Sequence, residues 1–476
     1  MIFNSAANVK DFGAVGDGVT DDTAAIQAAI NSGATEIIFD GVFSYTSKIS
    51  VASSCRIVNK GKFVYNGAYN ASNPHFNVTA DDVFFIGGEY DANEDIGSII
   101  QFGTSTTGGG VRDATFRNLL SKTELGSASG DFGCVVLKGT KADVHNCQFF
   151  DLVNSDTVTT NDSFPRAIVI TGTNNVVSDV SITEAQCPVI TTGNRNRITD
   201  IKAYGVADNG IYYGGQRNII INFYIKDADD EPVVFTGDNN TVTNMVIDNT
   251  DTGVVMNAIG VQNAENCVID GLTVLGKVKC ANLIKARTGN TTSSLTVLNA
   301  HATVSSAFEV FNFGIGTTDF KLINSTIYVV LDTGYDYNQI CDGGTQTFIG
   351  CHFDISEASG YTATQTYYYF LDEDFAESID TSISFRASSG YARSTPFANS
   401  DGSKNLWNNS WDTAWMNQTY VERRKEYYNS AAPTGGTWNQ GDIIWNTTPS
   451  AGGTLGWVCT TAGSPGTWKT FASIAS

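Results

Sequence analysis

A repeat of about 22 residues in the middle of the chain constrains the fold more than any other sequence feature. Five segments follow one template: an asparagine, then Asp or Asn four positions later, then alternating apolar residues. The steps between successive leading asparagines are 21, 22, 22 and 26 residues. The leading residues are Asn175, Asn196, Asn218, Asn240 and Asn266.

Each unit contains short runs of alternating apolar and polar residues, which are typical of β-strands, separated by Gly, Asn and Asp turns. No helix-length pattern lies between the runs, which excludes βαβ units. A coil of this length with three short strands indicates a parallel β-helix, in which each strand pairs with its counterpart one coil away. Leucine-rich repeats are the main alternative, but their LxxLxLxxN pattern is absent.

The recurring asparagine has a physical explanation within such a coil. Asparagine tolerates the left-handed backbone conformation of a sharp turn. Stacked once per coil, asparagine side chains can also hydrogen-bond to one another along the axis. The repeat predicts a shaft over residues 35–390, with about 15 coils and a length on the order of 70 Å for strands about 4.8 Å apart.

The first 34 residues predict a cap for the open end of this shaft. Thr20, Asp21 and Asp22 are good N-cap and first-turn residues. After them, Ile26 and Ile30 fall with Ala29 on one helical face. A short amphipathic helix here would cover the apolar end that a repeat protein otherwise exposes.

The charge composition limits the partners of the chain. It has 28 basic and 49 acidic residues, for a formal net charge of −21. This argues against general nucleic-acid binding, which needs a cationic surface. Only 16% of the residues are charged, so the surface is built mainly from Asn, Ser, Thr and Gly. Such a surface suits neutral, hydroxylated partners.

Metal sites, disulfides and membrane spans are not expected. The nine cysteines are well separated and form no CxxC pair, which favours reduced thiols that fill the core. No two of the four histidines share metal-ligand spacing, so we predict no metal and no cofactor. The chain shows neither a signal peptide nor an apolar run long enough to span a membrane.

The composition changes after the repeat. A connector over residues 391–430 carries Trp407, Trp411 and Trp415, which we expect to pack rather than bind sugar. Residues 431–476 predict a small Gly/Thr/Trp-rich β-module with four more tryptophans, at positions 438, 445, 457 and 468. These four can form either a trimer cap or a carbohydrate-binding surface.

Candidate catalytic residues lie in an acidic turn of the predicted coil. The 22-residue shift places Asp230 over Asp208 and Glu231 over Asn209, with Glu184 in the turn of the preceding coil. Carboxylates on adjacent coils have Cα atoms about 5 Å apart, which raises the pKa of one of them and makes it a general acid. One coil of separation suits a retaining glycosidase and two coils suit an inverting one. The alternative is that these are solvated turn acids.

Candidate substrate-binding residues surround this turn. Tyrosine rings can stack on sugar faces, and Tyr212 and Tyr213 alternate, so only one of the two can point outward. The insertion before residue 166 brings Arg166 near the same turn. The candidates are Tyr204, Tyr212, Tyr213, Tyr224 and Arg166.

The segment DFGAVGDGVTDDTAAIQAAI, at residues 11–30, resembles the opening signature of the pectate-lyase-like single-stranded right-handed β-helix superfamily. That superfamily includes polysaccharide lyases, glycoside hydrolases and depolymerising bacteriophage tailspikes. The resemblance implies a right-handed coil and action on carbohydrate. The last segment resembles C-terminal modules of tailspikes and tail fibres, which help to hold a trimer together.

Two narrower resemblances are incomplete. Asp208-Asn-Gly and Asp229-Asp230 are similar to the paired acidic motifs of polygalacturonases, but the downstream Gly-His-Gly and basic triplet are absent. The calcium-binding aspartates and catalytic arginine of pectate lyases are not identifiable either.

The sequence hypothesis is a homotrimeric phage tailspike that hydrolyses a bacterial capsular polysaccharide. Its expected partners are the glycan, two further copies of itself and phage tail proteins, with no nucleic acid and no membrane insertion. Its expected location is the virion tail, where it acts at the bacterial surface. A polysaccharide lyase that acts on a uronic-acid glycan and a non-catalytic glycan-binding adhesin remain the alternatives.

Overall fold

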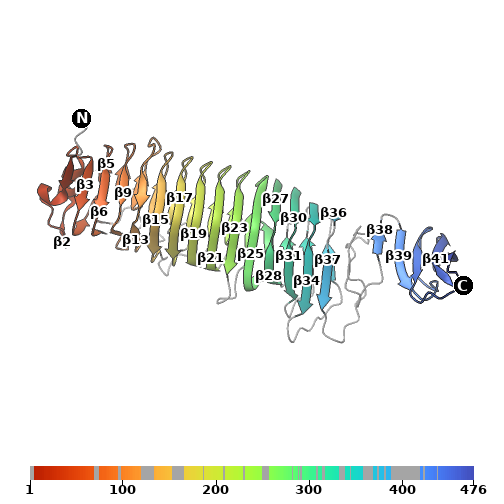
Figure 1. Cartoon of the computed structure of the whole chain (residues 1–476). Coiled ribbons are helices and arrows are strands. Elements are labelled where there is room, and N and C mark those ends of the chain that lie inside the picture. Colours follow the sequence, from red (N-terminus) through yellow and green to blue (C-terminus); the bar gives the residue numbers. More distant parts are fainter. Residues whose placement is uncertain are drawn as a thin grey trace.

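The structure is a computed structural model, and its described parts form a long shaft and a small C-terminal sheet (Figure 1). The described residues are 5–68, 74–94, 98–119, 133–152, 166–185, 187–206, 209–228, 231–248, 257–280, 282–287, 289, 292–306, 309–312, 317–331, 338–342, 345–357, 368–371, 375–379, 382–386, 419–421, 424–436 and 438–475.

Two parallel sheets run along the shaft. The narrow sheet has 13 strands, one per coil, with the order β35-β32-β29-β26-β24-β22-β20-β18-β16-β14-β11-β8-β5. The wide sheet has 24 strands, and many of them bend to form two faces of the coil. The predicted parallel β-helix is confirmed, and the 13 described narrow strands compare with the predicted 15 or so coils.

The narrow strands are three to five residues long. Their bounds are β5 (Ile49–Val51), β8 (Phe76–Val78), β11 (Ile100–Phe102), β14 (Val135–Leu137), β16 (Arg166–Ile170), β18 (Cys187–Thr191), β20 (Ile211–Tyr213), β22 (Val233–Phe235), β24 (Asn257–Val261), β26 (Asn282–Ala286), β29 (Glu309–Asn312), β32 (Asn338–Asp342) and β35 (Tyr368–Leu371).

The wide strands lengthen in the middle of the shaft. Their bounds are β1 (Ala6–Asn8), β2 (Asp17–Asp21), β3 (Glu36–Phe39), β4 (Val42–Tyr45), β6 (Arg56–Asn59), β7 (Lys62–Tyr65), β9 (Phe84–Ile86), β10 (Glu89–Asp91), β12 (Gly110–Arg112), β13 (Thr115–Arg117), β15 (Asp143–Phe150), β17 (Val176–Thr183), β19 (Arg197–Val206), β21 (Ile219–Ala228), β23 (Thr241–Asp248), β25 (Cys267–Cys280), β27 (Thr292–Leu298), β28 (His301–Ser306), β30 (Thr317–Ile323), β31 (Thr326–Leu331), β33 (Thr345–Ile349), β34 (His352–Glu357), β36 (Phe375–Ile379) and β37 (Ser382–Arg386).

The register confirms that one repeat is one coil. Ile198 lies beside Ile220, which lies beside Val242. Each of these side chains is buried in a continuous apolar core that runs along the inside of the shaft. The 22-residue repeat therefore stacks equivalent apolar side chains on one another, as parallel pairing requires.

The recurring asparagines form a buried hydrogen-bond ladder in the turn between each narrow strand and the next wide strand, here called the ladder turn. The Oδ1 of Asn218 accepts from the backbone N–H of Asn196 at 2.8 Å, and its Nδ2 donates to the carbonyl of Gly193 at 2.9 Å. Asn175, Asn196 and Asn240 make the equivalent bonds. The asparagines stack once per coil as predicted, but the expected bonds between their side chains were wrong, because each side chain reaches the backbone of the neighbouring coil.

The expected backbone role of these asparagines was wrong for the first four units. The left-handed residue is the one before each of them, as at Arg217 before Asn218, because the asparagine itself must point inward to reach the next coil. The fifth unit is shifted by one position. There Asn266 is left-handed, and Cys267 takes the ladder position and donates its Sγ–H to the carbonyl of Gly237.

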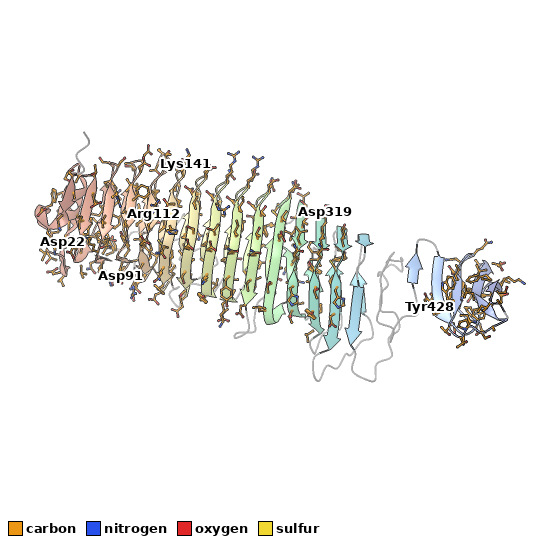
Figure 2. All side chains as sticks on the ribbon, in the orientation of Figure 1. Asp22, Asp91, Arg112, Lys141, Asp319 and Tyr428 are labelled. Carbon is orange, nitrogen blue, oxygen red and sulfur yellow. The ribbon has the colours of Figure 1, made fainter. Side chains whose placement is uncertain are left out.

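The predicted N-terminal cap is confirmed. Helix α1 (Thr23–Ile30) buries Ile26, Ala29 and Ile30 in the shaft core. The carboxylate of Asp22 accepts from the backbone N–H groups of Val15 and Gly16, at 2.7 and 3.0 Å (Figure 2). It therefore holds the preceding loop rather than the helix's own first turn.

The C-terminal module is a five-stranded sheet of β38 (Thr419–Val421), β39 (Arg424–Asn429), β40 (Ile443–Asn446), β41 (Thr454–Thr461) and β42 (Thr467–Ser473). Two of its strands precede residue 431, where the sequence places its start. Trp407, Trp411 and Trp415 lie outside the described residues. The cysteines whose side chains are described are free and buried, as expected for core-filling thiols: Cys55, Cys134, Cys147, Cys187, Cys267, Cys351 and Cys459.

Candidate active site

The acidic turn lies between the end of a wide strand and the start of the next narrow strand: β17 ends at Thr183 before β18 begins at Cys187, β19 ends at Val206 before β20 begins at Ile211, and β21 ends at Ala228 before β22 begins at Val233. The strands on both sides keep the 22-residue shift, because Val206 pairs with Ala228 and Ile211 pairs with Val233. The backbone N–H of Gly210 donates to the carbonyl of Glu231 at 3.2 Å. Asp208 and Asp230 lie outside the described residues.

Glu231 is the one acidic-turn candidate whose carboxylate the structure buries among the described residues. Its exposed fraction is 3%. Asn257, its neighbour in the next coil, donates from Nδ2 to Oε1 at 3.3 Å. Gly260 leaves the room that the carboxylate occupies, since a Cβ at that position would lie 2.6 Å from Oε2. The glycine therefore serves a close approach rather than a turn.

This carboxylate lies against the outer face of the narrow sheet. In β22, Val233 and Phe235 belong to the interior core, so the intervening Val234 points outward. Gly260 pairs with Val234 and with Lys285 in the neighbouring strands, so it shares this outward column. Glu231 is thus folded over the outside of the shaft, with its carboxylate packed on the outer face of the narrow sheet.

Arg287 compensates the charge of this carboxylate. It follows β26, two coils beyond Glu231, and its Nε lies 3.1 Å from Oε2. The arginine side chain is 32% exposed and the glutamate side chain 4%. A carboxylate that is removed from water needs such a partner, because its own desolvation is strongly unfavourable.

The outward column places one of the two alternating tyrosines on the same face. Tyr212 is half-buried between Ile190 and Val234. Tyr213 is fully buried, stacks on Phe235 with ring centroids 5.2 Å apart, and has a pKa raised by its burial. The assignment of Tyr213 to substrate binding was wrong, because its ring fills the shaft core.

The other two tyrosines lie on the wide sheet, on the opposite side of the acidic turn. The rings of Tyr204 and Tyr224 have centroids 5.7 Å apart. Tyr224 donates its Oη–H to Asp248 at 2.8 Å. Burial and this hydrogen bond raise the pKa of Tyr224 to about 12. The structure does not bring these rings onto the face that carries Tyr212.

Glu184 and Arg166 have different surroundings. Glu184 is exposed and left-handed, with φ of 56°, and it stacks below Gly205 in the next coil. Arg166 begins β16 and is half-buried, in the same axial column as Glu231 but three coils away. Three coils correspond to about 14 Å.

Sequence reasoning missed Arg287, Asn257 and Gly260. Arg287 is separated from Glu231 by two coils whose lengths differ, so spacing alone does not pair them. Gly260 did leave a signal, because it interrupts the apolar residues of the strand Asn257–Val261. A glycine in a strand interior often marks the close approach of another group.

Within the part of the chain that the structure describes, no group of three or more His, Cys, Asp or Glu side chains is placed to hold a metal ion. Among the described residues, no helix is both long enough and apolar enough to cross a membrane.

These features define a class: parallel β-helix proteins with an outward-facing candidate site on one sheet. A family model described as "Rhamnogalacturonase A/epimerase, pectate lyase-like" matches residues 6–276, more than half of the chain. The chain therefore belongs to this family, which confirms the resemblance seen at residues 11–30. A comparison with curated proteins found no match.

Solved structures show the same fold. The tailspike protein of Escherichia coli bacteriophage HK620 in complex with a pentasaccharide is similar, with a TM-score of 0.55 and 12% identity. A variant of that tailspike in complex with a pentasaccharide gives 0.53 and 12%, and a double mutant gives 0.52 and 12%. In each case the match covers 79% of this chain and 78% of the tailspike chain.

Proposed function

We propose that this chain is a phage tailspike that binds and hydrolyses a bacterial surface polysaccharide. The proposed substrate is a capsular polysaccharide, and the proposed site is the outer face of the narrow sheet. The family assignment and the fold of a tailspike bound to a pentasaccharide support action on a glycan. The observation that carries the proposal is the buried carboxylate of Glu231, held outside the shaft by Arg287 and Asn257.

The chemistry follows from that arrangement. Glycosidic hydrolysis needs two carboxyl groups with different environments. Glu231 is the desolvated, charge-compensated member, suited to act as nucleophile or general base. Asp230 is its neighbour in the chain and Asp208 belongs to the adjacent coil, so we assign the general acid to one of these two. Tyr212 offers a ring on the same face for stacking on a sugar.

A glycan cleavage assay tests this function. The full-length protein is incubated with capsular polysaccharides from many strains, and the fragments are analysed by mass spectrometry. Fragments that have gained one water establish hydrolysis. Unsaturated ends that absorb ultraviolet light would establish a lyase instead, and binding without any fragments would establish an adhesin. The Glu231→Gln variant is expected to bind the same glycan without cleaving it.

We also propose that three copies assemble and that the C-terminal module holds them together at the virion tail. Among the described residues of this module, the buried apolar side chains are Ile444 and Cys459, a small core for a five-stranded sheet. The indole N–H groups of Trp438 and Trp468 donate to the carbonyls of Gly435 and Pro465. Because these N–H groups are already bonded within the module, they are not available to a sugar hydroxyl. We therefore expect the tryptophan rings to pack rather than to bind sugar.

Light scattering tests the assembly. A mass three times that of the chain is expected for the full-length protein, and a monomer mass would contradict the proposal. Retention of the trimer after removal of residues 431–476 would contradict only the role of the module.

A further inference from the structure

The ladder turn contains a column of left-handed residues that runs along one edge of the shaft. From Asp82 to Asn239 the backbone N–H of this residue donates to a carbonyl in the next coil, as Arg195 does to Gln216 at 2.9 Å, and Asn266 donates to the Oγ of Ser294 instead. The column, with positive φ at every position, consists of Asp82, Gly108, Lys141, Asn174, Arg195, Arg217, Asn239 and Asn266.

Three members of this column are residue types that rarely adopt the left-handed conformation. Lys141, Arg195 and Arg217 have φ of 58°, 56° and 58°. Long side chains disfavour this conformation, whereas Gly, Asn and Asp adopt it readily. The coils in between and beyond use Asn174 and Asn239 in the same turn, so the fold does not require a cation here. Strain that persists at a surface position points to a function.

These three cations are exposed and are joined by a fourth. Arg197 points outward from β19, two residues after Arg195. Among the described residues, no carboxylate forms an ion pair with any of the four, whereas Arg112 nearby is bound by Asp143 through two hydrogen bonds. Figure 2 labels Lys141 on this edge. The four residues Lys141, Arg195, Arg197 and Arg217 are here called the cation edge.

Apolar side chains lie between these cations. Val176 and Ile219 flank Arg197 in the register of the wide sheet, and their exposed fractions are 39% and 41%. The cation edge ends where the following coils place Asp238 and Glu265 at the turn. A surface that offers cations and apolar contacts together fits a ring that carries an anionic group and a hydrocarbon face.

We propose that the cation edge binds a polysaccharide whose sugar units carry carboxylates. A guanidinium can bind a carboxylate through two parallel hydrogen bonds, and Val176 and Ile219 can contact the C–H faces of the ring. Arg195 and Arg217 belong to adjacent coils, about 4.8 Å apart, so a chain laid along the shaft meets successive cations. The choice of a polysaccharide over other polyanions rests on the proposed function. The edge lies on a different turn from Glu231, so binding there does not need that residue.

The test measures binding rather than cleavage. Affinity of the full-length protein for alginate, a polyuronate, is compared with affinity for dextran, a neutral glycan, at low and high salt. The test variant is Lys141→Asn/Arg195→Asn/Arg217→Asn. Because asparagine suits the left-handed turn, this variant is expected to fold with a melting temperature no lower than that of the parent. We expect roughly a fivefold loss of alginate affinity for each cation removed and a weaker salt dependence.

A matched control removes the same charge elsewhere. Lys48→Asn/Arg56→Asn/Lys60→Asn takes three exposed cations from the N-terminal coils and should leave alginate affinity unchanged. Arg195→Lys/Arg217→Lys should retain most of the binding. Failure of the parent to bind alginate more tightly than dextran would overturn the inference, as would equal losses in the test and control variants. Equally tight binding of duplex DNA would also overturn it, because the edge would then be a general polyanion surface.

Discussion

The ladder turn and the acidic turn of each coil differ in regularity. The ladder turn repeats its hydrogen bonds from Asn175 to Asn240 with little change, and all four asparagines are buried there. The acidic turn places unlike residues at the equivalent position, namely Cys187, Asn209, Glu231 and Asn257. The first turn maintains the stacking of the shaft, which leaves the second free to vary and to carry a site.

The largest expected effect lies in the acidic turn. Glu231→Gln should reduce glycan depolymerisation by at least about a hundredfold, the scale for loss of a general acid or base. Asp208→Asn and Asp230→Asn should each have effects of similar size. Glu184→Gln is the comparison variant and should retain activity, because this sequence candidate lies exposed in the turn two coils away from Glu231. Initial rates on one glycan, measured side by side, check this prediction.

A second measurement separates the chemistry of Glu231 from its structural role. The single change leaves Arg287 without its counter-charge, so the melting temperature should fall somewhat. Adding Arg287→Gln should recover stability but not activity. Recovery of activity in the double variant would show that Glu231 acts only by neutralising the arginine.

The ladder turn should show a large effect on stability and none on chemistry. Asn218→Ala leaves the N–H of Asn196 and the carbonyl of Gly193 without their partners, at a cost of about 2–5 kcal/mol in the free energy of unfolding. Asn222→Gly is the control, because it removes two side-chain hydrogen bonds that are both exposed, one donated to Asp200 and one accepted from Asn244. Equal losses in the two variants, measured by denaturant unfolding, would show that burial of the ladder contributes nothing.

Lowering the pH should destabilise ionised side chains such as Asp91 and leave the uncharged asparagine ladder unaffected. Burial raises the pKa of Asp91, but hydrogen bonds from Lys62 and Asn118 outweigh it and hold that pKa below its usual value. A lowered pKa contributes stability above the ordinary value of about 4, and that stability is lost as the pH falls through the lowered value. Melting temperatures between neutral pH and pH of about 3 should therefore drop less steeply for Asp91→Asn than for the parent.

The smallest expected effect is a gain in stability. Glu184 is left-handed at a position where the next coil has Gly205. Glu184→Asn should relieve the backbone and raise the free energy of unfolding by about 0.5–1 kcal/mol. A loss of stability would mean that the glutamate side chain makes a contribution larger than its backbone strain.

The fold could be predicted from the sequence because one sequence repeat corresponds to one coil of the shaft. The spacing of Asn218 and its counterparts predicted the coil length and the stacking of asparagines. The helical spacing of Ile26 and Ile30 predicted the N-terminal cap. The exact turn geometry was harder to predict, since the left-handed position is one residue earlier, at Arg217. Asn266 matched the sequence template although its unit is shifted by one residue. It is the left-handed residue of its turn, and Cys267 takes the ladder position.

The site was only partly predictable. Counting residues placed Glu231 beside Asn209, but the partner of the glutamate comes from two coils away. Tyr213 could not be separated from Tyr212 by alternation alone, which gives the two faces but not which one is the core. Variation in coil length along the chain hides contacts such as Glu231 to Arg287, because the number of intervening residues is not a multiple of one period.

The location of a bound glycan tests the central claim most directly. A crystal structure of the Glu231→Gln variant with an oligosaccharide from the cleaved polymer should show the sugar on the outer face of the narrow sheet. The account predicts that a ring contacts Tyr212 and that a glycosidic linkage lies within hydrogen-bond distance of the side chain at position 231. An oligosaccharide bound only elsewhere, such as on the tryptophans of the C-terminal module, would contradict the claim.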